Sequence, residues 1–336
     1  MNTMNTNLNP FRICRSVCAA ATLALLWLPA SPARAQITAQ EVANMMGSRV
    51  EAATILGGDF GLSGATFSGQ KNNGVSLNIS KFGGSGDIGD PKPLGDLGIG
   101  WQPRLQGSMG YLTAANRFDS SAPGGLAGAK STFDSFAIQF GGGARFWFGD
   151  HFSMAPTFMG MYGHTFNNFF IRNSAITQGQ VDAARDAGLV DWYADTFTYR
   201  PAMNLQYAYA WRRTVFTLSS DPTYFHTISI HSSSSSLNTG GDSDTWMNKI
   251  DVDVPLGTSL WGHELRTGGY FSRTELMGKL KQGLGNNDHI YEVHGRLVLD
   301  YLNQLWKVQW IGIGYSYLWG RTFDGYSVGL DVAFRF

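Results

Sequence analysis

Cysteine is almost absent from this sequence. Among 336 residues there are only two, Cys14 and Cys18, so nothing after position 18 carries a thiol. A disulfide framework, a thiolate metal site and a cysteine nucleophile are therefore excluded from the rest of the chain. Charge is also sparse, because Asp, Glu, Lys and Arg make up only 15% of the residues, with 25 basic and 25 acidic side chains. The chain has no basic excess to attract nucleic acid.

Long apolar runs are missing too, apart from a short one near the N-terminus. The run Cys18–Ala30 follows Arg12 and Arg15 and precedes Ala-Arg-Ala at 33–35. At roughly 13 residues it is too short to anchor the chain across a bilayer. This order of basic, apolar and small residues predicts a cleaved export signal over residues 1–35. Three of the 25 basic residues and none of the acidic ones lie there, which leaves a net charge of −3 on the mature chain.

Glycine, with 42 residues, and aromatic side chains, at 13%, are plentiful. The last eleven residues read YSVGLDVAFRF, with apolar side chains on one face of a strand and small or polar ones on the other. Such a strand ending in Phe resembles the C-terminal signal by which bacterial outer-membrane barrels are recognised for assembly. The residues that carry this resemblance are Tyr326, Val328, Leu330, Val332, Phe334 and Phe336.

The same alternation recurs along the chain and predicts about twelve strands. Short turns near residues 149, 212, 257 and 303 alternate with long connections near 120, 180, 238 and 280. We therefore expect an all-β fold, a transmembrane antiparallel β-barrel over residues 58–336, with apolar residues facing lipid and polar residues facing the lumen. A short helix is expected around 181–187. The predicted strands cover residues 59–68, 73–82, 97–111, 136–148, 152–164, 197–211, 215–230, 246–254, 260–271, 290–301, 305–319 and 326–336.

Three prolines and one phase change interrupt this pattern. Pro103, Pro156 and Pro201 fall inside predicted strands. Because proline has no N–H to donate to a ladder, each predicts a local gap in strand pairing. The alternation changes phase between Trp310 and Ile311, which indicates a β-bulge or a misplaced strand boundary.

A helical segment is expected ahead of the barrel, in residues 36–57. Thr38-Ala-Gln-Glu41 forms a capping box, and apolar residues then recur every three or four positions, which predicts a helix from about 39 to 54. Two interpretations stay open: a plug inside the lumen, or a periplasmic helix packed beneath the barrel.

Charged side chains of both signs fall on the inferred inward face. They suit either a selective pore or ligand site, or a salt-bridged network that fills the lumen. Because the two signs are intermixed, we favour the structural network. The predicted lumen-facing residues are Arg104, Arg145, Arg200, Lys249, Asp251, Asp253, Glu264, Arg266, Glu292, His294, Arg296, Asp300, Asp331 and Arg335.

Neither a metal site nor a cofactor site is predicted. Asp251 and Asp253 share a strand face but lack a glycine-bearing calcium loop. One catalytic candidate is His231-Ser-Ser233, which matches the His-x-Ser element of outer membrane phospholipase A. Two points count against this candidate. Ile228 and Ile230 are expected to face lipid, which places His231 on the lumen side, whereas the phospholipase acts from its lipid-facing surface. No acid is positioned to orient the histidine.

The helix, the twelve strands and the C-terminal Phe strand together resemble the β-domain of autotransporters. Only about twenty residues separate Gln36 from the first strand, so the resemblance is to solitary barrels without a passenger domain. It implies a porin-like protein of the bacterial outer membrane, partnered by outer-membrane lipid and, during biogenesis, by the barrel-assembly machinery. The expected function is non-enzymatic, structural or weakly pore-forming; the alternatives are a phospholipase A-like lipid hydrolase and a small-solute channel. Neither a substrate nor an oligomeric state follows from the sequence.

Overall fold

A computed structural model describes most of the chain after the first 60 residues. The described residues are 61–69, 76–117, 130–170, 177–186, 191–233, 240–284, 286–305, 308–321 and 323–334. The export signal expected over 1–35 and the helix expected within 36–57 lie outside them, as do Arg335 and Phe336.

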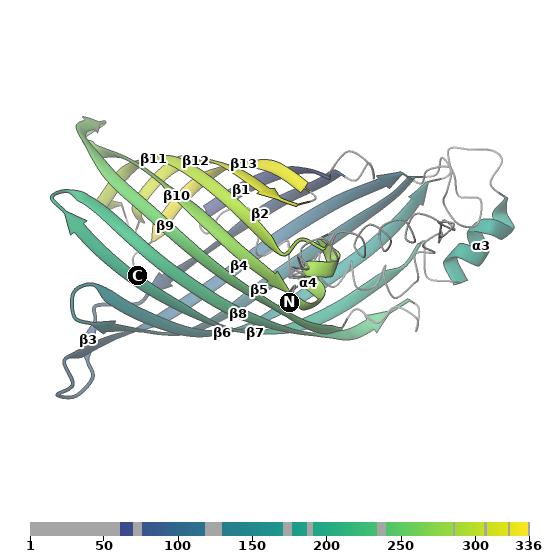
Figure 1. Ribbon diagram of the computed structural model, residues 1–336, viewed down its shortest axis with the longest axis horizontal. Coiled ribbons are helices and arrows are strands. Elements are labelled where there is room, and N and C mark those ends of the chain that lie inside the picture. The colour runs from purple at the N-terminus through teal and green to yellow at the C-terminus, as the bar shows by residue number, and fades with distance from the viewer. Residues whose placement is uncertain are drawn as a thin grey trace, which may run out of the picture. The chain divides into compact units, whose positions relative to one another are not determined.

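The described strands form one antiparallel sheet that closes on itself (Figure 1). The first strand pairs with the last strand and with the second, and the second strand pairs in turn with β4, so the described sheet closes into a ring. Without the two-residue β3, this ring has twelve strands. The strands are β1 (Gly61–Gly69), β2 (Ser76–Asp87), β3 (Lys92–Pro93), β4 (Ile99–Arg117), β5 (Lys130–Phe148), β6 (Phe152–Phe170), β7 (Tyr193–Trp211), β8 (Thr214–Ser232), β9 (Gly241–Leu260), β10 (His263–Met277), β11 (His289–Leu305), β12 (Val308–Gly320) and β13 (Phe323–Phe334).

In the described part of the chain, two short helices lie in the connections between strands. One, α3 (Gln178–Asp186), overlaps the helix expected around 181–187, and the other is α4 (Gly278–Gly283). In Figure 1 the tight turns β5–β6, β7–β8 and β9–β10 lie at one end, which we call the turn end. Helix α3 lies at the other, the loop end. No helix in the described part of the chain is long and apolar enough to cross a membrane.

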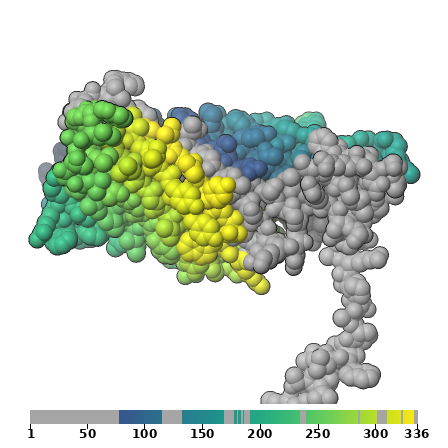
Figure 2. Space-filling model, turned by 90° about the horizontal axis from the view of Figure 1, so that it is seen from above, coloured from purple at the N-terminus to yellow at the C-terminus, as the bar shows by residue number. Residues whose placement is uncertain are grey.

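The alternation of side chains gives the ring an apolar outer face. On β13, Tyr326, Val328 and Leu330 are each about half exposed, whereas Ser327 between them is 4% exposed. Aromatic and β-branched residues suit such a pleated surface, because their side chains pack against neighbours on the same face. Figure 2 shows the yellow C-terminal strands running beside the green strands that precede them.

One strand boundary differs from the sequence prediction, and one predicted irregularity is confirmed. The turn expected near 257 is formed by Trp261 and Gly262, which have φ values of 53° and 82°. Gly257, with φ 69°, instead belongs to a β-bulge where the register between β9 and β10 shifts. A glycine in this left-handed conformation reads as a turn in sequence but also permits a bulge. The bulge expected near Trp310 is confirmed, because the β12–β13 register shifts between Val308 and Trp310.

The prolines interrupt the ladder in two places. Pairing between β5 and β6 is broken beside Pro156, and pairing between β7 and β8 is broken beside Pro201 and Pro222. For Pro103 the expected gap lies on one side only: its pairing with Ala144 of β5 is continuous, whereas the β2–β4 ladder ends at Arg104. Pairing on that side resumes at Trp101, with β3.

Candidate functional site: the lumen and the outer face

The ring encloses a polar cavity of about 520 Å³, which we call the lumen cavity. Its lining comes from strands all around the ring, and it holds side chains of both charges. Nine of the residues predicted to face the lumen line it: Arg104, Arg145, Arg200, Lys249, Asp251, Glu292, His294, Arg296 and Asp331.

One side of the lumen cavity is built around Asp87. Its carboxylate accepts a 2.7 Å hydrogen bond from Arg104 Nη1 and lies 3.1 Å from Arg145 Nε. Arg145 also donates to Gln206 Oε1 at 2.7 Å. Sequence reasoning missed Asp87 because its Gly-Ser-Gly-Asp context predicts a loop, whereas β2 continues to this residue.

The other side of the lumen cavity is built around Arg296. Its guanidinium binds both carboxylate oxygens of Asp251, at 2.7 and 2.8 Å, a two-pronged geometry that fixes the side chain. Tyr270 donates to Glu292 at 2.8 Å, and the ammonium of Lys249 lies 5.1 Å from the Tyr270 ring centroid. The ion pair Asp251–Arg296 thus joins β9 to β11 across the intervening β10.

His294 sits between a serine and a carboxylate. Its Nδ1 lies 2.8 Å from Ser316 Oγ and its Nε2 lies 3.2 Å from Asp331 Oδ2, while its ring stacks on Tyr270 at 4.7 Å. The spacing is that of a nucleophile, base and acid. However, Ser316 is 2% exposed and is not among the residues that line the lumen cavity, so its hydroxyl fixes the imidazole and is not presented to a substrate.

Among the described residues, the remaining predicted charges lie apart from the lumen cavity. Arg266 pairs with Asp253 at 3.1 Å and approaches Glu264 at 3.7 Å, close to the β9–β10 turn. Arg213 of the neighbouring turn also binds Glu264. The Asp300 carbonyl lies 3.2 Å from the His263 ring. These contacts join consecutive hairpins at the turn end.

The structure places His231 on the outer face, so its expected lumen-side position is wrong. A register shift follows the pair Asp195–His231, because Thr196 pairs with Ser229 and Ile230 is left over. This bulge turns His231 to the face of Asp195 and Tyr193, where its Nδ1 lies 3.8 Å from Asp195 Oδ2. The acid that the sequence did not reveal is therefore present. The Ser233 hydroxyl, however, contacts the backbone of Tyr193.

Asp195 belongs to a recurring feature of the outer face that sequence reasoning missed. Towards the loop end, a tyrosine hydroxyl donates to an aspartate on the neighbouring strand. We call these the tyrosine–aspartate pairs. An aspartate near the start of a strand is the only signal for them in the sequence, and in each pair it lies two residues before the register partner of the tyrosine. They are Tyr111–Asp134, Tyr162–Asp195, Tyr224–Asp242 and Tyr317–Asp324, with O–O distances of 2.8, 2.8, 2.6 and 3.1 Å.

Histidine accompanies two of these pairs, but no metal centre is formed. His164 lies 2.7 Å from Asp195, and His226 lies 2.7 Å from Asp242. Within the described ranges, no three His, Cys, Asp or Glu side chains gather closely enough to hold a metal ion.

Comparison with known proteins identifies the family. Residues 93–331 match the model of the solitary outer membrane autotransporter beta-barrel domain. No curated protein matches this chain. Among solved structures, the transport unit of the autotransporter AIDA-I from Escherichia coli is similar, with a TM-score of 0.52 and 10% identity over 87% of this chain and 99% of that one.

Two further autotransporter structures resemble this chain at lower scores. The translocator domain of NalP from Neisseria meningitidis has a TM-score of 0.45 and 13% identity, over 96% of this chain and 99% of that one. The beta domain of BrkA from Bordetella has a TM-score of 0.46 and 13% identity, over 82% and 99%. The family match spans well over half of the sequence, and the chain belongs to the solitary outer membrane autotransporter beta-barrel domain family, proteins of the bacterial outer membrane.

Proposed function

We propose that this protein is a non-enzymatic, structural barrel of the outer membrane whose lumen is closed to all but slow ion passage. The observation that supports this is the pairing of opposite charges along the wall of the lumen cavity, in Asp87–Arg104 and Asp251–Arg296. Rings of one charge sign select ions strongly, whereas paired charges hold walls together. The volume of about 520 Å³ also suits a filled interior better than a wide channel.

Planar-bilayer recording tests this proposal. We expect the wild type to give small or no current steps. The Asp251→Asn variant leaves the positive charge of Arg296 without its main partner, so any residual current should shift towards anions. The double variant Asp251→Asn/Arg296→Gln should restore the wild-type reversal potential. Asp324→Asn, on the outer face, is the matched control and should have no effect. Large, stable wild-type currents would overturn the proposal.

A second recording tests the segment ahead of the barrel. We propose that residues 36–57 occupy the lumen as a plug, because their predicted helix has one apolar and one polar face. Deleting them should then raise the conductance several-fold relative to the full mature chain. Unchanged conductance would favour a helix outside the lumen.

Hydrolysis of lipid esters is a second candidate function, and one observation favours it. The Ile230 bulge brings His231 to the lipid-facing side, beside Asp195, which supplies an orienting acid. Ser233 would have to leave its contacts with Tyr193 to become a nucleophile. Phospholipase activity that is lost in Ser233→Ala and in His231→Ala, but kept in Ser232→Ala, would support it. Activity that persists in Ser233→Ala would remove it from this site.

A further inference from the structure

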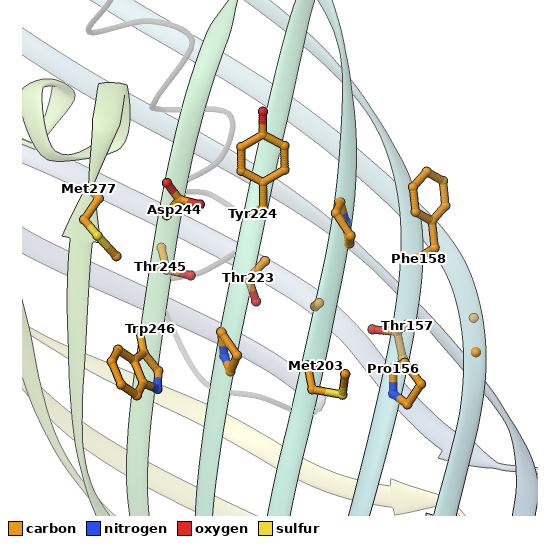
Figure 3. A pocket seen from close by; sticks show the side chains of 15 residues that line it. Pro156, Thr157, Phe158, Met203, Thr223, Tyr224, Asp244, Thr245, Trp246 and Met277 are labelled. Carbon is orange, nitrogen blue, oxygen red and sulfur yellow. The ribbon is translucent and has the colours of Figure 1, made fainter.

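The outer face carries an apolar groove of about 710 Å³ that crosses five strands from β5 to β9 and reaches β10. We call it the proline groove. Figure 3 shows its lining in three rows, with Thr245, Thr223 and Thr157 in the middle one. It is lined by Gly142, Gly143, Pro156, Thr157, Phe158, Pro201, Ala202, Met203, Pro222, Thr223, Tyr224, Asp244, Thr245, Trp246 and Met277.

The floor of the proline groove is a row of small residues in exact strand register. Gly143 pairs with Thr157, Thr157 with Ala202, Ala202 with Thr223, and Thr223 with Thr245. Four of these five, all except Gly143, also line the lumen cavity. The wall between the outside and the lumen is therefore one backbone layer with short side chains along this row.

Prolines explain why the wall is indented at this row. Pro156, Pro201 and Pro222 each immediately precede a residue of the floor, on three consecutive strands. Each lacks an N–H, and the ladder is interrupted beside them in β5–β6 and β7–β8. Larger side chains flank the floor: Phe158 lies on one side of the threonine row, and Met203 and Trp246 lie on the other (Figure 3).

The proline groove runs obliquely relative to the ends of the strands. At β9 the floor residue is Thr245, near the loop-end start of that strand, whereas at β5 it is Gly143, near the turn-end finish. Towards the loop end, the groove reaches Tyr224, which donates to Asp242, and His226 lies beside this pair. The groove thus runs from a polar site towards the loop end to an apolar stretch nearer the turn end.

We propose that this groove binds one acyl chain of a membrane lipid, with the lipid's polar end beside Tyr224 and Asp242. The chain belongs to an outer-membrane family, so hydrocarbon surrounds this face, and the lining is apolar except towards the loop end. Prolines and glycines leave room that lipid tails fill, because an empty groove would forfeit dispersion contacts. The inference does not depend on whether the lumen conducts ions.

Quenching of Trp246 by brominated lipid tests the proposal. Detergent-solubilised protein is titrated with phosphatidylcholine carrying dibrominated acyl chains, which quench tryptophan on contact. Subtracting the fluorescence of Trp246→Phe from that of the wild type gives the quenching curve of Trp246. The same subtraction with Trp211→Phe gives the curve of Trp211, an exposed tryptophan outside the groove. Trp246 should be half-quenched at a roughly tenfold lower lipid fraction than Trp211. Unbrominated oleate should relieve the quenching of Trp246 first.

Variants of the groove give a second readout. Replacing Pro156, Pro201 and Pro222 by valine together should restore ladder donors, flatten the groove and move the Trp246 curve onto that of Trp211. Pro103→Val, a strand proline outside the groove, is the matched control and should leave both curves unchanged. If Trp246 and Trp211 of the wild type are quenched at the same lipid fraction, and oleate relieves both equally, the groove holds only bulk lipid and the proposal is overturned.

Discussion

Single glycines decide how closely neighbouring strands approach. A Cβ added to Gly143 would lie 1.9 Å from the Pro156 carbonyl oxygen, a backbone atom that cannot move aside alone. Gly295 lies in a strand too, but a Cβ there meets nothing within 4 Å. The two positions are therefore a matched test of crowding within one barrel.

We predict that Gly143→Ala lowers the free energy of unfolding by about 1–3 kcal/mol, because β5 and β6 must separate to admit the methyl group. Gly295→Ala should change it by less than about 0.5 kcal/mol. Urea unfolding in detergent, followed by tryptophan fluorescence, measures both. Equal effects of the two substitutions would show that the close approach at Gly143 does not limit stability.

At the residue scale, the sequence predicted which face of a strand a side chain occupies better than it predicted which side chains contact each other. Alternation alone assigned Arg296, Asp251 and Asp331 to the inward face, because side-chain direction follows from position along a strand. It could not identify Asp87 or Asp195. The first depends on where β2 ends, and the second on a one-residue bulge that reverses the face of His231. Bulges are set by pairing between strands and leave little trace in a single sequence.

At the scale of elements, the sequence predicted the number of strands, but the predicted strands were too short at the loop end. β5 begins at Lys130 and β7 at Tyr193, several residues before the predicted starts. Clear apolar alternation is required only where the outer face meets hydrocarbon. Beyond that region the strands continue, but polar side chains such as those of the tyrosine–aspartate pairs lie on the outer face. The alternation of apolar and polar residues therefore no longer marks the strand.

Helix α4 and its flanking loop are fixed by polar contacts outside the membrane span. The Leu280 amide donates to Ser243 Oγ at 3.1 Å, and Lys281 binds Asp288. The hydrogen bond from Lys281, together with its positive charge, lowers the pKa of Asp288 below its usual 3.8. A lowered carboxyl pKa adds stability above the ordinary value, and this is lost as pH falls through the lowered pKa.

We therefore predict that the α4 loop loosens in acid. Hydrogen exchange at the Leu280 and Leu284 amides should be slow at neutral pH. In the wild type, local opening of the loop should become more frequent as pH falls below 3.8 towards the lowered pKa, and the protection of both amides should fall. In Asp288→Asn the amides should already be less protected at pH 7 and show no further opening in that range. Identical protection in the two proteins at pH 7 would contradict a role for the Lys281–Asp288 pair.

For the whole molecule, the decisive feature is the pairing of the first strand with the last. Ala65 is in register with Ser327 across the β1–β13 ladder. Directly opposed Cα atoms in such a ladder lie about 4.5–5.5 Å apart, a distance that a disulfide bridges. Because both native cysteines lie in the first 18 residues, a pair of cysteines introduced into a chain that begins at Gln36 would report this contact alone.

We predict that Ala65→Cys/Ser327→Cys cross-links under mild oxidation in the folded barrel, with peptide mass mapping without reductant as the measurement. Ala65→Cys/Phe323→Cys, four residues out of register and so roughly 13 Å away, should stay reduced. Cross-linking of neither pair would mean that the sheet stays open between its first and last strands.

The interrupted ladders on either side of β6 and β7 have a mechanical consequence. Pairing within β6–β7 is continuous, whereas β5–β6 and β7–β8 each miss contacts beside a proline. Under heat or lateral tension, this pair of strands should detach from β5 and from β8 before β6 and β7 separate from each other. Unfolding would then begin with the detachment of β6 and β7 as one unit, and not with simultaneous loosening of all the strands.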